Sequence, residues 1–336
     1  MTQANGDDML TVEDLSVAFR TDFGVSAAVN DVSFSVRAGR VLAILGESGS
    51  GKSVLLRTIM GISRGRKTKI TGQIRFEGQE LVSLREKEYL KVRAGAMAMI
   101  FQDPMTALDP VFTVGYQLVE TMRKNLGLTR TEARTRAIEL LEQVKIQNPQ
   151  SRFNAYPDQL SGGMQQRVMI ALAMSCGPRL LLADEPTTSL DVTVQAQILR
   201  LILDLQRQSH SAMIFVTHDI GVAANVADDV AVMYGGRIVE LGPVADVLRD
   251  PGHPYTRGLM DANVAPGLKG RLKTIPGQPP APHRLPPGCS FSDRCPHVRD
   301  ECLTEVPPLY SLAEAGRHVR CVLAADAAHP LAMADG

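Results

Sequence analysis

The sequence predicts an α/β protein built around a mostly parallel β-sheet with helices on both faces. Short apolar runs at 41–45, 180–183 and 213–217, of which only the last ends in a polar residue, are typical of strands buried on both sides. Between the last two runs, apolar residues recur at helical spacing from Val194 to Leu205. Buried strands that alternate with amphipathic helices indicate a covered parallel sheet. The length of 336 residues suits one large domain with appendages, or two domains.

Other elements flank this alternation. Residues 15–19 and 32–36 alternate apolar and polar side chains, which predicts strands. Residues 230–241 are interrupted by Gly235-Gly236 and predict a hairpin. The region 105–165 has no obvious strand, and we expect a helical insert there.

One helix of this insert has a clear start signal. Thr129 and Glu132 form a capping-box pattern, and apolar residues then fall on one face as far as Val144. This pattern predicts an amphipathic helix that packs against its neighbours in the insert.

The composition argues against several classes of function. Lys and Arg total 36 and Asp and Glu total 36, so no charge excess favours a polyanionic partner. Aromatic residues make up 4% of the chain, and Trp is absent, which disfavours base stacking. No run is long enough for a membrane-spanning helix, and the first ten residues lack the features of a signal peptide. We therefore expect a cytoplasmic chain that binds no nucleic acid and reaches a membrane through partners.

Residues 46–53 read GESGSGKS, directly after the apolar run 41–45. The pattern Gly-x-x-x-x-Gly-Lys-Ser is typical of a phosphate-binding loop, because glycine lets successive backbone N–H groups turn toward a triphosphate. Lys52 supplies charge for the β- and γ-phosphates, and Ser53 supplies a hydroxyl for Mg²⁺. The alternative is a surface Gly/Ser loop, which the buried strand before it disfavours. We predict that the whole loop binds the nucleotide, namely Gly46, Glu47, Ser48, Gly49, Ser50, Gly51, Lys52 and Ser53.

A second motif, LLLADEPTTSLD, occupies residues 180–191. Asp184 ends the apolar run, where its carboxylate can hold Mg²⁺. Glu185 is placed to orient and deprotonate an attacking water. The alternative is an acidic surface turn, and the phosphate loop elsewhere in the chain disfavours it.

Two further polar residues end predicted strands. Gln102 follows the apolar run 96–101, and its amide can contact Mg²⁺ and the attacking water. His218 follows 213–217, and a neutral imidazole there can donate a hydrogen bond to the γ-phosphate. Taken alone, each residue is more often simply a polar strand end, so both assignments depend on the other motifs.

Residues 160–167 read LSGGMQQR and open an apolar-periodic helix. Ser161 is a candidate N-cap, and Gly162 and Gly163 leave the first backbone amides open to an anion. The chain therefore has a second predicted anion-binding helix end.

In this order, the motifs and Asp191 resemble those of the nucleotide-binding subunit of an ATP-binding cassette (ABC) transporter, over about residues 10–245. The resemblance implies a P-loop NTPase (RecA-like) core with an antiparallel β subdomain, the helical insert and a small C-terminal Cys-rich module. It also implies two subunits that face head to tail, with each ATP and its Mg²⁺ between the loop of one and the LSGG helix of the other. The residues implied are Glu185, His218 and Gln102 for catalysis; Phe19 for adenine; Ser53, Gln102 and Asp184 for Mg²⁺; and Ser161, Gly162, Gly163, Gln165 and Asp191 for the ATP of the partner subunit.

The chain departs from the family pattern at three places. Met164 follows LSGG where many members have Gln, and Gln159 precedes Leu160 where many have Glu. The third is Ser189-Leu190-Asp191, which replaces the more usual Ala-Leu-Asp. None of these changes removes a catalytic group, so we expect hydrolysis rather than a nucleotide sensor without turnover. Whether both composite sites hydrolyse equally stays open.

The tail resembles one branch of this family. Residues 253–259 (HPYTRGL) and 288–302 (GCSFSDRCPHVRDEC) resemble the C-terminal module of dipeptide, oligopeptide and nickel importer ATPases, and FQDPMTALDP fits their "D"-type subunit. Pro and Gly crowd 275–288, which breaks regular structure. We expect a nucleotide-binding domain over 1–245 and the module over 246–336.

Four of the five cysteines lie in the last fifth of the chain. In a reducing cytoplasm disulfides are disfavoured, so such a group points to a metal. Thiolates suit iron–sulfur clusters and zinc alike, and absence of a stable metal is the third alternative. The fifth cysteine, Cys176, is expected to be a buried apolar residue. The resemblance implies a [4Fe–4S] cluster, with Zn²⁺ as the alternative, on Cys289, Cys295, Cys302 and Cys321.

The resemblance implies an ATPase that powers import of di- and oligopeptides from the cytoplasmic face of the inner membrane, as a peripheral subunit. Its implied partners are a homologous "F"-type ATPase, two integral membrane permeases and an extracytoplasmic solute-binding protein. Because the solute does not touch this chain, nickel chelates, opines and oligosaccharides stay open, as does a homodimer. A soluble ABC ATPase of ribosomes or DNA is the alternative from another class, and it is disfavoured by the single cassette and the short interval before LSGG.

Overall fold

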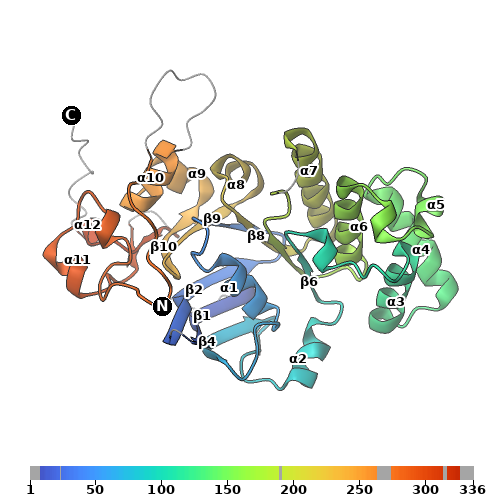
Figure 1. Ribbon diagram of the computed structural model, residues 1–336, viewed down its shortest axis with the longest axis horizontal. Coiled ribbons are helices and arrows are strands. Elements are labelled where there is room, and N and C mark those ends of the chain that lie inside the picture. The colour runs from blue at the N-terminus through green and yellow to red at the C-terminus, as the bar shows by residue number, and fades with distance from the viewer. Residues whose placement is uncertain (1–7, 23, 189–190, 263–273, 313–315, 326–336) are drawn as a thin grey trace. The chain divides into compact units, whose positions relative to one another are not determined.

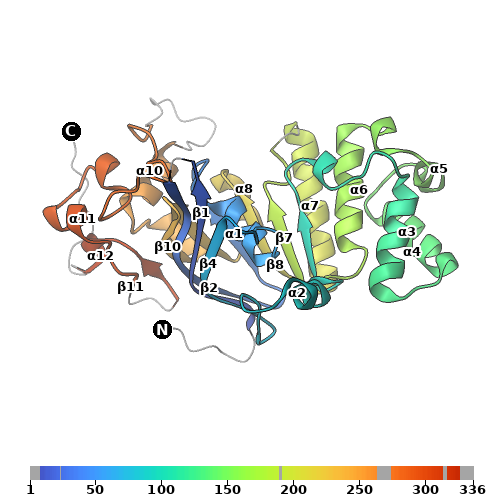
Figure 2. The same cartoon turned by 60° about the horizontal axis from the view of Figure 1, so that its bottom comes forward.

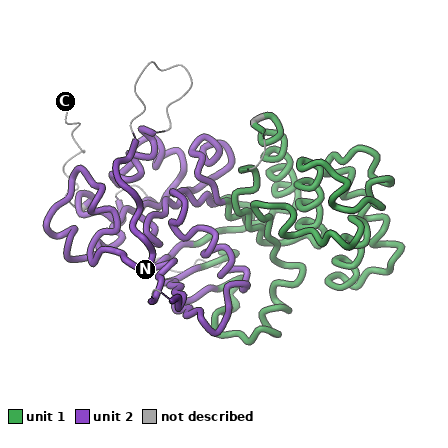
Figure 3. Tube along the Cα trace, in the orientation of Figure 1, with its two compact units in different colours: residues 1–11, 35–41, 75–215 green, residues 12–34, 42–74, 216–336 purple. Residues whose placement is uncertain are grey.

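The computed structural model describes residues 8–22, 24–188, 191–262, 274–312 and 316–325. Figure 1 labels the elements along the chain, and Figure 3 colours two compact units. Unit 1 comprises residues 1–11, 35–41 and 75–215, and unit 2 comprises residues 12–34, 42–74 and 216–336. None of the helices in the described ranges combines the length and apolar character needed to cross a bilayer.

Unit 2 contains most of three long strands, β1 (Asp8–Thr21), β2 (Gly24–Arg37) and β4 (Thr68–Phe76), in the order β2-β1-β4. Their apolar side chains alternate with more exposed ones; Leu15 and Val17, for example, are fully buried on β1. The strands predicted from 15–19 and 32–36 are therefore confirmed and are longer than the sequence indicated.

The second sheet of unit 2 has the order β11-β12-β10-β9-β3. β3 (Val41–Leu45) runs parallel to β9 (Asp229–Tyr234), and β9 pairs antiparallel with β10 (Arg237–Pro243). The predicted hairpin is confirmed, and its turn contains Gly235 and Gly236. The last two strands, β12 (His318–Val319) and β11 (Tyr310–Ser311), come from the C-terminal segment.

Short helices complete unit 2. They are α1 (Lys52–Ile59), α8 (Ile220–Val226), α9 (Val244–Arg249), α10 (Pro254–Ala262), η3 (Ser292–Arg294), α11 (Asp300–Thr304) and α12 (Val322–Ala325).

One apolar core joins the second sheet to the C-terminal segment. Tyr234 of β9, Tyr255 of α10 and Phe291 before η3 are each at most 2% exposed. The rings of Tyr234 and Tyr255 lie 4.5 Å apart, and Phe291 meets Tyr234 edge-on at 5.2 Å. Such aromatic contacts add to the burial of large apolar area. The C-terminal segment therefore shares its core with β9 and β10.

Unit 1 pairs β6 (Met97–Ile100) with β7 (Leu180–Asp184) in parallel, and every residue of both strands is buried. Between them the structure, which describes this whole interval, has helices and no strand. Figure 2 shows the insert helices as a group beside α6. The helices of this interval are η1 (Pro104–Thr106), α3 (Val114–Leu126), α4 (Arg130–Gln143), α5 (Pro149–Phe153), η2 (Pro157–Gln159) and α6 (Gly162–Met174).

The predicted capping box at the start of α4 is confirmed. Thr129 Oγ1 accepts a hydrogen bond from the Glu132 N–H at 3.3 Å, and the Thr129 N–H donates to the Glu132 carboxylate at 2.8 Å. The Thr129 hydroxyl also donates to the Glu132 carboxylate at 2.6 Å. This bond and the one from the Thr129 N–H lower the pKa of Glu132 below its ordinary value.

The remaining elements of unit 1 are β5 (Gln79–Glu80), α2 (Glu86–Arg93) and α7 (Val192–Ser209), and β8 (Ala212–Thr217) begins in it. The helix predicted between Val194 and Leu205 is confirmed as the central part of α7, whose residues Ile198 and Ile202 are buried.

Candidate nucleotide-binding site

The loop Gly46–Gly51 lies in unit 2 between β3 and α1, as the sequence predicts. Lys52 is 5% exposed, and its Nζ donates to the carbonyl oxygens of Gly46 at 2.8 Å and Glu47 at 2.9 Å. A Cβ at Gly46 would overlap the carbonyl oxygen of Met233, and Gly51 has φ +101 at the N-cap of α1. The glycines therefore fit the close backbone packing, and the amides at the start of α1 suit an anion.

Glu47, the second residue of the loop, contacts two residues of the C-terminal segment. Arg294 donates to both carboxylate oxygens, at 2.8 and 3.2 Å, and its side chain is 5% exposed. The backbone N–H of Glu47 donates to the hydroxyl oxygen of Tyr255 at 2.9 Å. Glu47 was predicted from the loop motif to contact the nucleotide. Its two partners could not be predicted from that motif, because they lie more than 200 positions away.

Two predicted residues lie elsewhere in unit 2. Phe19 is half-buried on β1, and His218 is exposed after β8. The turn after His218 is fixed because the Asp219 carboxylate accepts from the Val222 N–H at 3.1 Å and caps α8.

The acidic motif lies in unit 1, at the end of β7. Asp184 is 2% exposed, and Glu185 follows it with φ +46. Positive φ is uncommon for a residue with a side chain, and such strain is often found at functional sites. Thr188 Oγ1 donates to the Glu185 carboxylate at 2.9 Å, so this carboxylate has a defined hydrogen-bond donor.

The LSGG segment opens α6 in the same unit. Ser161 stands at the N-cap position, but its side chain makes no capping hydrogen bond, so the expectation that its side chain caps α6 is wrong. Gly162 is exposed and Gly163 half-exposed. The Gln165 amide donates to the Pro157 carbonyl oxygen at 2.8 Å, which ties the helix start to η2.

Two other residues of unit 1 hold the segments around these motifs in place. The fully buried Gln166 donates from α6 to the carbonyl oxygen of Pro186, directly after Glu185. The Asp191 carboxylate accepts from the Val194 N–H at 3.0 Å and caps α7. Gln166 was missed because its side chain acts through tertiary contact. Ser189 and Leu190 lie outside the described residues, and Gln102 is exposed after β6.

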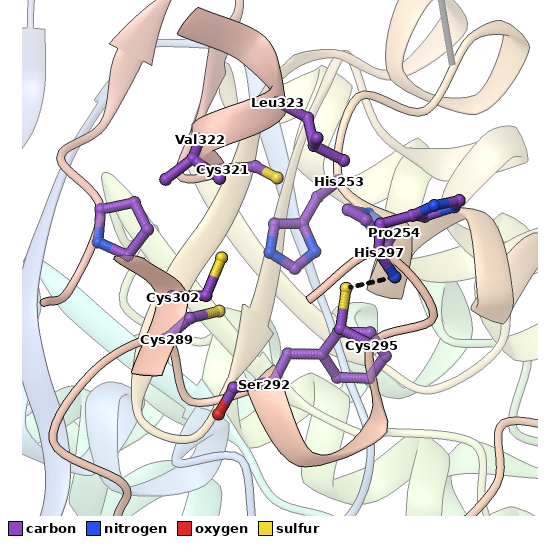
Figure 4. A pocket seen from close by; sticks show the side chains of 12 residues that line it. His253, Pro254, Cys289, Ser292, Cys295, His297, Cys302, Cys321, Val322 and Leu323 are labelled. Atoms are coloured by element: carbon purple, nitrogen blue, oxygen red, sulfur yellow. Dashed lines mark hydrogen bonds between the residues drawn. The ribbon is translucent and has the colours of Figure 1, made fainter. Parts of the chain in front are cut away.

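A separate pocket in unit 2 collects the four predicted cysteines. Cys289, Cys295, Cys302 and Cys321 all line it together with His253, and Figure 4 shows their sulfur atoms around the His253 ring. Within the ranges that the structure describes, no group of three or more His, Cys, Asp or Glu side chains is arranged to hold a metal ion.

Burial dominates the electrostatics of this pocket. It raises the pKa of Cys289 and Cys295, and raises that of Cys321 to about 11. Burial also lowers the pKa of His253 to about 3, and His253 Nδ1 accepts from the Tyr255 N–H at 3.0 Å. Burial therefore favours the neutral forms of the Cys289, Cys295 and Cys321 thiols and of the His253 imidazole.

Comparisons with known proteins extend along most of the chain. A family model described as "ABC transporter" matches residues 29–188, and one described as "Oligopeptide/dipeptide transporter, C-terminal region" matches residues 239–302. The oligopeptide transport ATP-binding protein OppD of Escherichia coli is 47% identical over 92% of this chain and 91% of its own. The chain belongs to the family of ABC transporter ATP-binding subunits.

Other relatives of this ABC ATPase agree. The dipeptide transport protein DppD of E. coli is 45% identical over 93% of this chain and 96% of its own, and AppD of Bacillus subtilis is 44% identical over 94% and 96%. Among solved structures, the dimeric cassette MJ0796 bound to ADP and Pi has a TM-score of 0.63 at 26% identity, covering 70% of this chain and 99% of that one. CbiO1 of Clostridium perfringens has a TM-score of 0.61 at 30% identity, covering 72% and 91%.

Membership in the family supplies the reaction. This ABC ATPase binds ATP and hydrolyses it, and hydrolysis is coupled to transport. The predicted P-loop NTPase fold is confirmed.

Proposed function

We propose that this ABC ATPase powers the import of di- and oligopeptides. The observation that carries the proposal is the pairing of the cassette with the C-terminal region at residues 239–302 in one chain, because relatives with both parts are named oligopeptide or dipeptide transport proteins. Nickel chelates, opines and oligosaccharides are the competing solutes. In the proposed importer the solute does not touch this chain, and the other subunits select it.

The assembly in this proposal has four further members. A homologous "F"-type ATPase completes the dimer, two integral membrane permeases carry the solute, and an extracytoplasmic binding protein delivers it. The chain then sits at the cytoplasmic face of the inner membrane as a peripheral subunit. The dimeric state of MJ0796, a structural neighbour, supports a two-cassette arrangement.

The proposed roles at the nucleotide follow the motifs. Residues 46–53 bind the phosphates, and Glu185 deprotonates the attacking water. His218 donates a hydrogen bond to the γ-phosphate, and Gln102 contacts the attacking water. Phe19 stacks on adenine. The loop at 46–53 lies in unit 2, whereas Gln102 and Glu185 lie in unit 1. We infer that they bind the same nucleotide from the motif order that the chain shares with the family. The proposed contacts to the ATP of the partner subunit are made by Ser161, Gly162, Gly163, Gln165 and Asp191.

The proposed magnesium ligands are oxygen donors of the type that Mg²⁺ prefers: Ser53, Gln102 and Asp184. Bound Mg²⁺ neutralises phosphate charge. Asp184 is buried at the end of β7. A buried carboxylate is usually paired with a cation or bound to a metal, which supports Asp184 as a magnesium ligand.

We also propose that residues 246–336 form a module whose four pocket cysteines hold a [4Fe–4S] cluster, with Zn²⁺ as the alternative. Four thiols lining one pocket fit the donor chemistry of either group. A bound cluster or ion would stabilise the folded module, because its bonds to the thiolates form only where the fold brings these side chains together. These bonds would also offset the cost of deprotonating Cys289, Cys295 and Cys321, whose pKa burial raises.

The importer proposal is tested with the Glu185→Gln variant. Replacing the general base should abolish turnover and stabilise an ATP-bound closed dimer. Affinity purification of this variant from detergent-solubilised native membranes, with ATP and Mg²⁺, should recover two permeases and a second cassette. Addition of peptides with the binding protein should then stimulate ATP hydrolysis by the wild-type complex. Recovery of ribosomal or DNA-associated proteins instead, or stimulation by nickel chelates but not peptides, would refute the peptide-importer proposal.

The metal proposal is tested by anaerobic purification followed by iron, acid-labile sulfide and zinc analysis. About four irons and four sulfides per chain support the cluster, and one zinc per chain supports the alternative. A chain that contains neither iron nor zinc refutes both assignments. Cys302→Ser should remove the metal. Cys176→Ser, a change at the half-buried cysteine of unit 1, is the matched control and should retain it.

A further inference from the structure

We propose that Arg294 of the C-terminal segment is a positioning residue for ATP binding. Arg294 neutralises Glu47 and fixes the phosphate-binding loop, although it lies outside the cassette motifs. Tyr255 supports the same loop residue through its hydroxyl. The proposal rests on nucleotide binding by the loop and adds a residue that none of the motifs contains.

The first argument is the geometry of the guanidinium group. Its two terminal nitrogens donate to the two Glu47 carboxylate oxygens at 2.8 and 3.2 Å, which is the bidentate arrangement that arginine alone provides. The remaining donors bind the Pro276 carbonyl oxygen at 2.7 Å, the Ile275 carbonyl oxygen at 3.3 Å and the Tyr234 hydroxyl at 3.2 Å. All five N–H groups are therefore placed, and the fork cannot turn without breaking several bonds.

The second argument is charge. Glu47 is a carboxylate inside a loop whose task is to hold a polyanion, and like charges at such a short range oppose binding. The side chain of Arg294 is 5% exposed and that of Glu47 is 25% exposed, so solvent screens this pair only in part. The ion pair removes the repulsion at the loop and leaves the charge of Lys52 available to the phosphates.

The third argument is the second contact to the same residue. The Tyr255 hydroxyl accepts from the Glu47 N–H at 2.9 Å, and Tyr255 is fully buried in the core that it shares with Tyr234 and Phe291. Backbone and side chain of Glu47 are thus held separately by the C-terminal segment. This fixes the path of the chain at the start of the loop, before ATP arrives.

The test measures binding of the fluorescent analogue mant-ATP, with Mg²⁺, to the full-length chain. Arg294→Gln should raise the Kd about tenfold, which corresponds to about 1.4 kcal/mol. In a Glu47→Gln background the same Arg294 change should alter Kd less than about twofold, because no carboxylate is then left to neutralise. The loss in the single variant should shrink at high salt, which screens the unpaired carboxylate.

Two further variants keep the test decisive if Arg294→Gln folds poorly. Arg294→Lys keeps the charge without the fork, and Tyr255→Phe keeps the ring without the acceptor; each should raise Kd about threefold. Arg320→Gln is the matched control, since Arg320 is a similarly buried arginine of the same segment that binds Ile238, Pro307 and Asp31. It should leave Kd unchanged, and thermal melting compares the folding of all variants.

The outcomes separate this proposal from the proposed function. A wild-type chain that binds no mant-ATP overturns nucleotide binding itself. Wild-type binding with an unchanged Kd in Arg294→Gln overturns the positioning role alone. An equal loss in both Glu47 backgrounds also overturns it, because that result assigns Arg294 to general packing.

Discussion

A buried ion pair beside the cysteine pocket gives the sharpest stability prediction. Glu240 on β10 is fully buried, and its carboxylate accepts from the N–H groups of Gly252 at 2.8 Å and His253 at 3.0 Å. Arg317, whose side chain is 6% exposed, donates to the same carboxylate at 3.3 Å. The pair therefore connects β10, the turn before α10 and the segment before β12.

Arg317→Met should lower the free energy of unfolding by about 3 kcal/mol at pH 7.5. Removing one member of a buried pair leaves an uncompensated charge, which typically costs about 3–5 kcal/mol, and the two backbone N–H groups hold the effect at the lower end. In Glu240→Gln/Arg317→Met both charges are gone, so most of the loss should be recovered. The comparison with the single variant isolates the charge from the lost packing.

The effect should also depend on pH. Burial raises the pKa of Glu240, although hydrogen bonds from the N–H groups of Gly252 and His253 and the charge of Arg317 oppose the shift. When the pKa of an acid is higher in the folded state than in the unfolded state, the acid contributes to stability below its unfolded pKa. This contribution is lost as the pH rises through the folded-state pKa. Loss of Arg317 raises that pKa further, so the variant should be destabilised less at pH 5 than at pH 8.

Urea unfolding followed by near-UV circular dichroism measures this, because Tyr234 and Tyr255 lie in the core of the same unit. The midpoint and slope give the free energy for each variant. A loss below about 0.5 kcal/mol in Arg317→Met would place the pair with exposed ion pairs and refute the reasoning. A double variant as unstable as the single one would refute it as well.

Three further predictions concern unit 1. Thr188→Val removes the hydroxyl that donates to Glu185 and should lower kcat about fivefold with little change in KM, in steady-state ATPase assays; an unchanged kcat contradicts the orienting role. Gly115→Ala should destabilise the chain by about 1–3 kcal/mol in urea unfolding, because the added Cβ would overlap the Phe153 ring. A stabilisation of about 1 kcal/mol, from the higher helix propensity of alanine, would contradict this and show that the ring can move. Glu132→Gln should lower Tm at pH 7, and because the pKa of Glu132 is lowered in the folded state, this difference should vanish as pH falls through that pKa; a constant difference down to pH 3 would contradict the capping carboxylate.

The sequence predicted the elements that have a strong local signal. The loop at 46–53, the hairpin around Gly235-Gly236 and the capping box at Thr129 are each specified within a few residues, and the structure contains all three. The strand β4 and the helix α2 were not predicted from the sequence. Gly72 interrupts the alternation of β4, and Tyr89 is the buried residue of α2, so neither element has a clear apolar pattern.

The candidate site divides in the same way. Its motif residues could be read directly, because each chemical task requires a residue type at a fixed spacing. Their partners could not: Gln166 reaches Pro186, and Arg294 reaches Glu47, through contacts that no spacing encodes. The hydrogen bond by which the Ser161 side chain was expected to cap α6 is absent, because an N-cap position does not guarantee a capping bond.

By itself, the sequence determined the class of fold, the nucleotide chemistry and the family, since these depend on short residue patterns and on local apolar periodicity. The tertiary structure alone decided which side chains meet across the chain. It brought four cysteines from 289–321 to one pocket with His253, and it placed a C-terminal arginine on the phosphate-binding loop. The reason is physical: burying Tyr234, Tyr255 and Phe291 in one core fixes segments distant in sequence at contact distance, and only then do their charges and donors find partners.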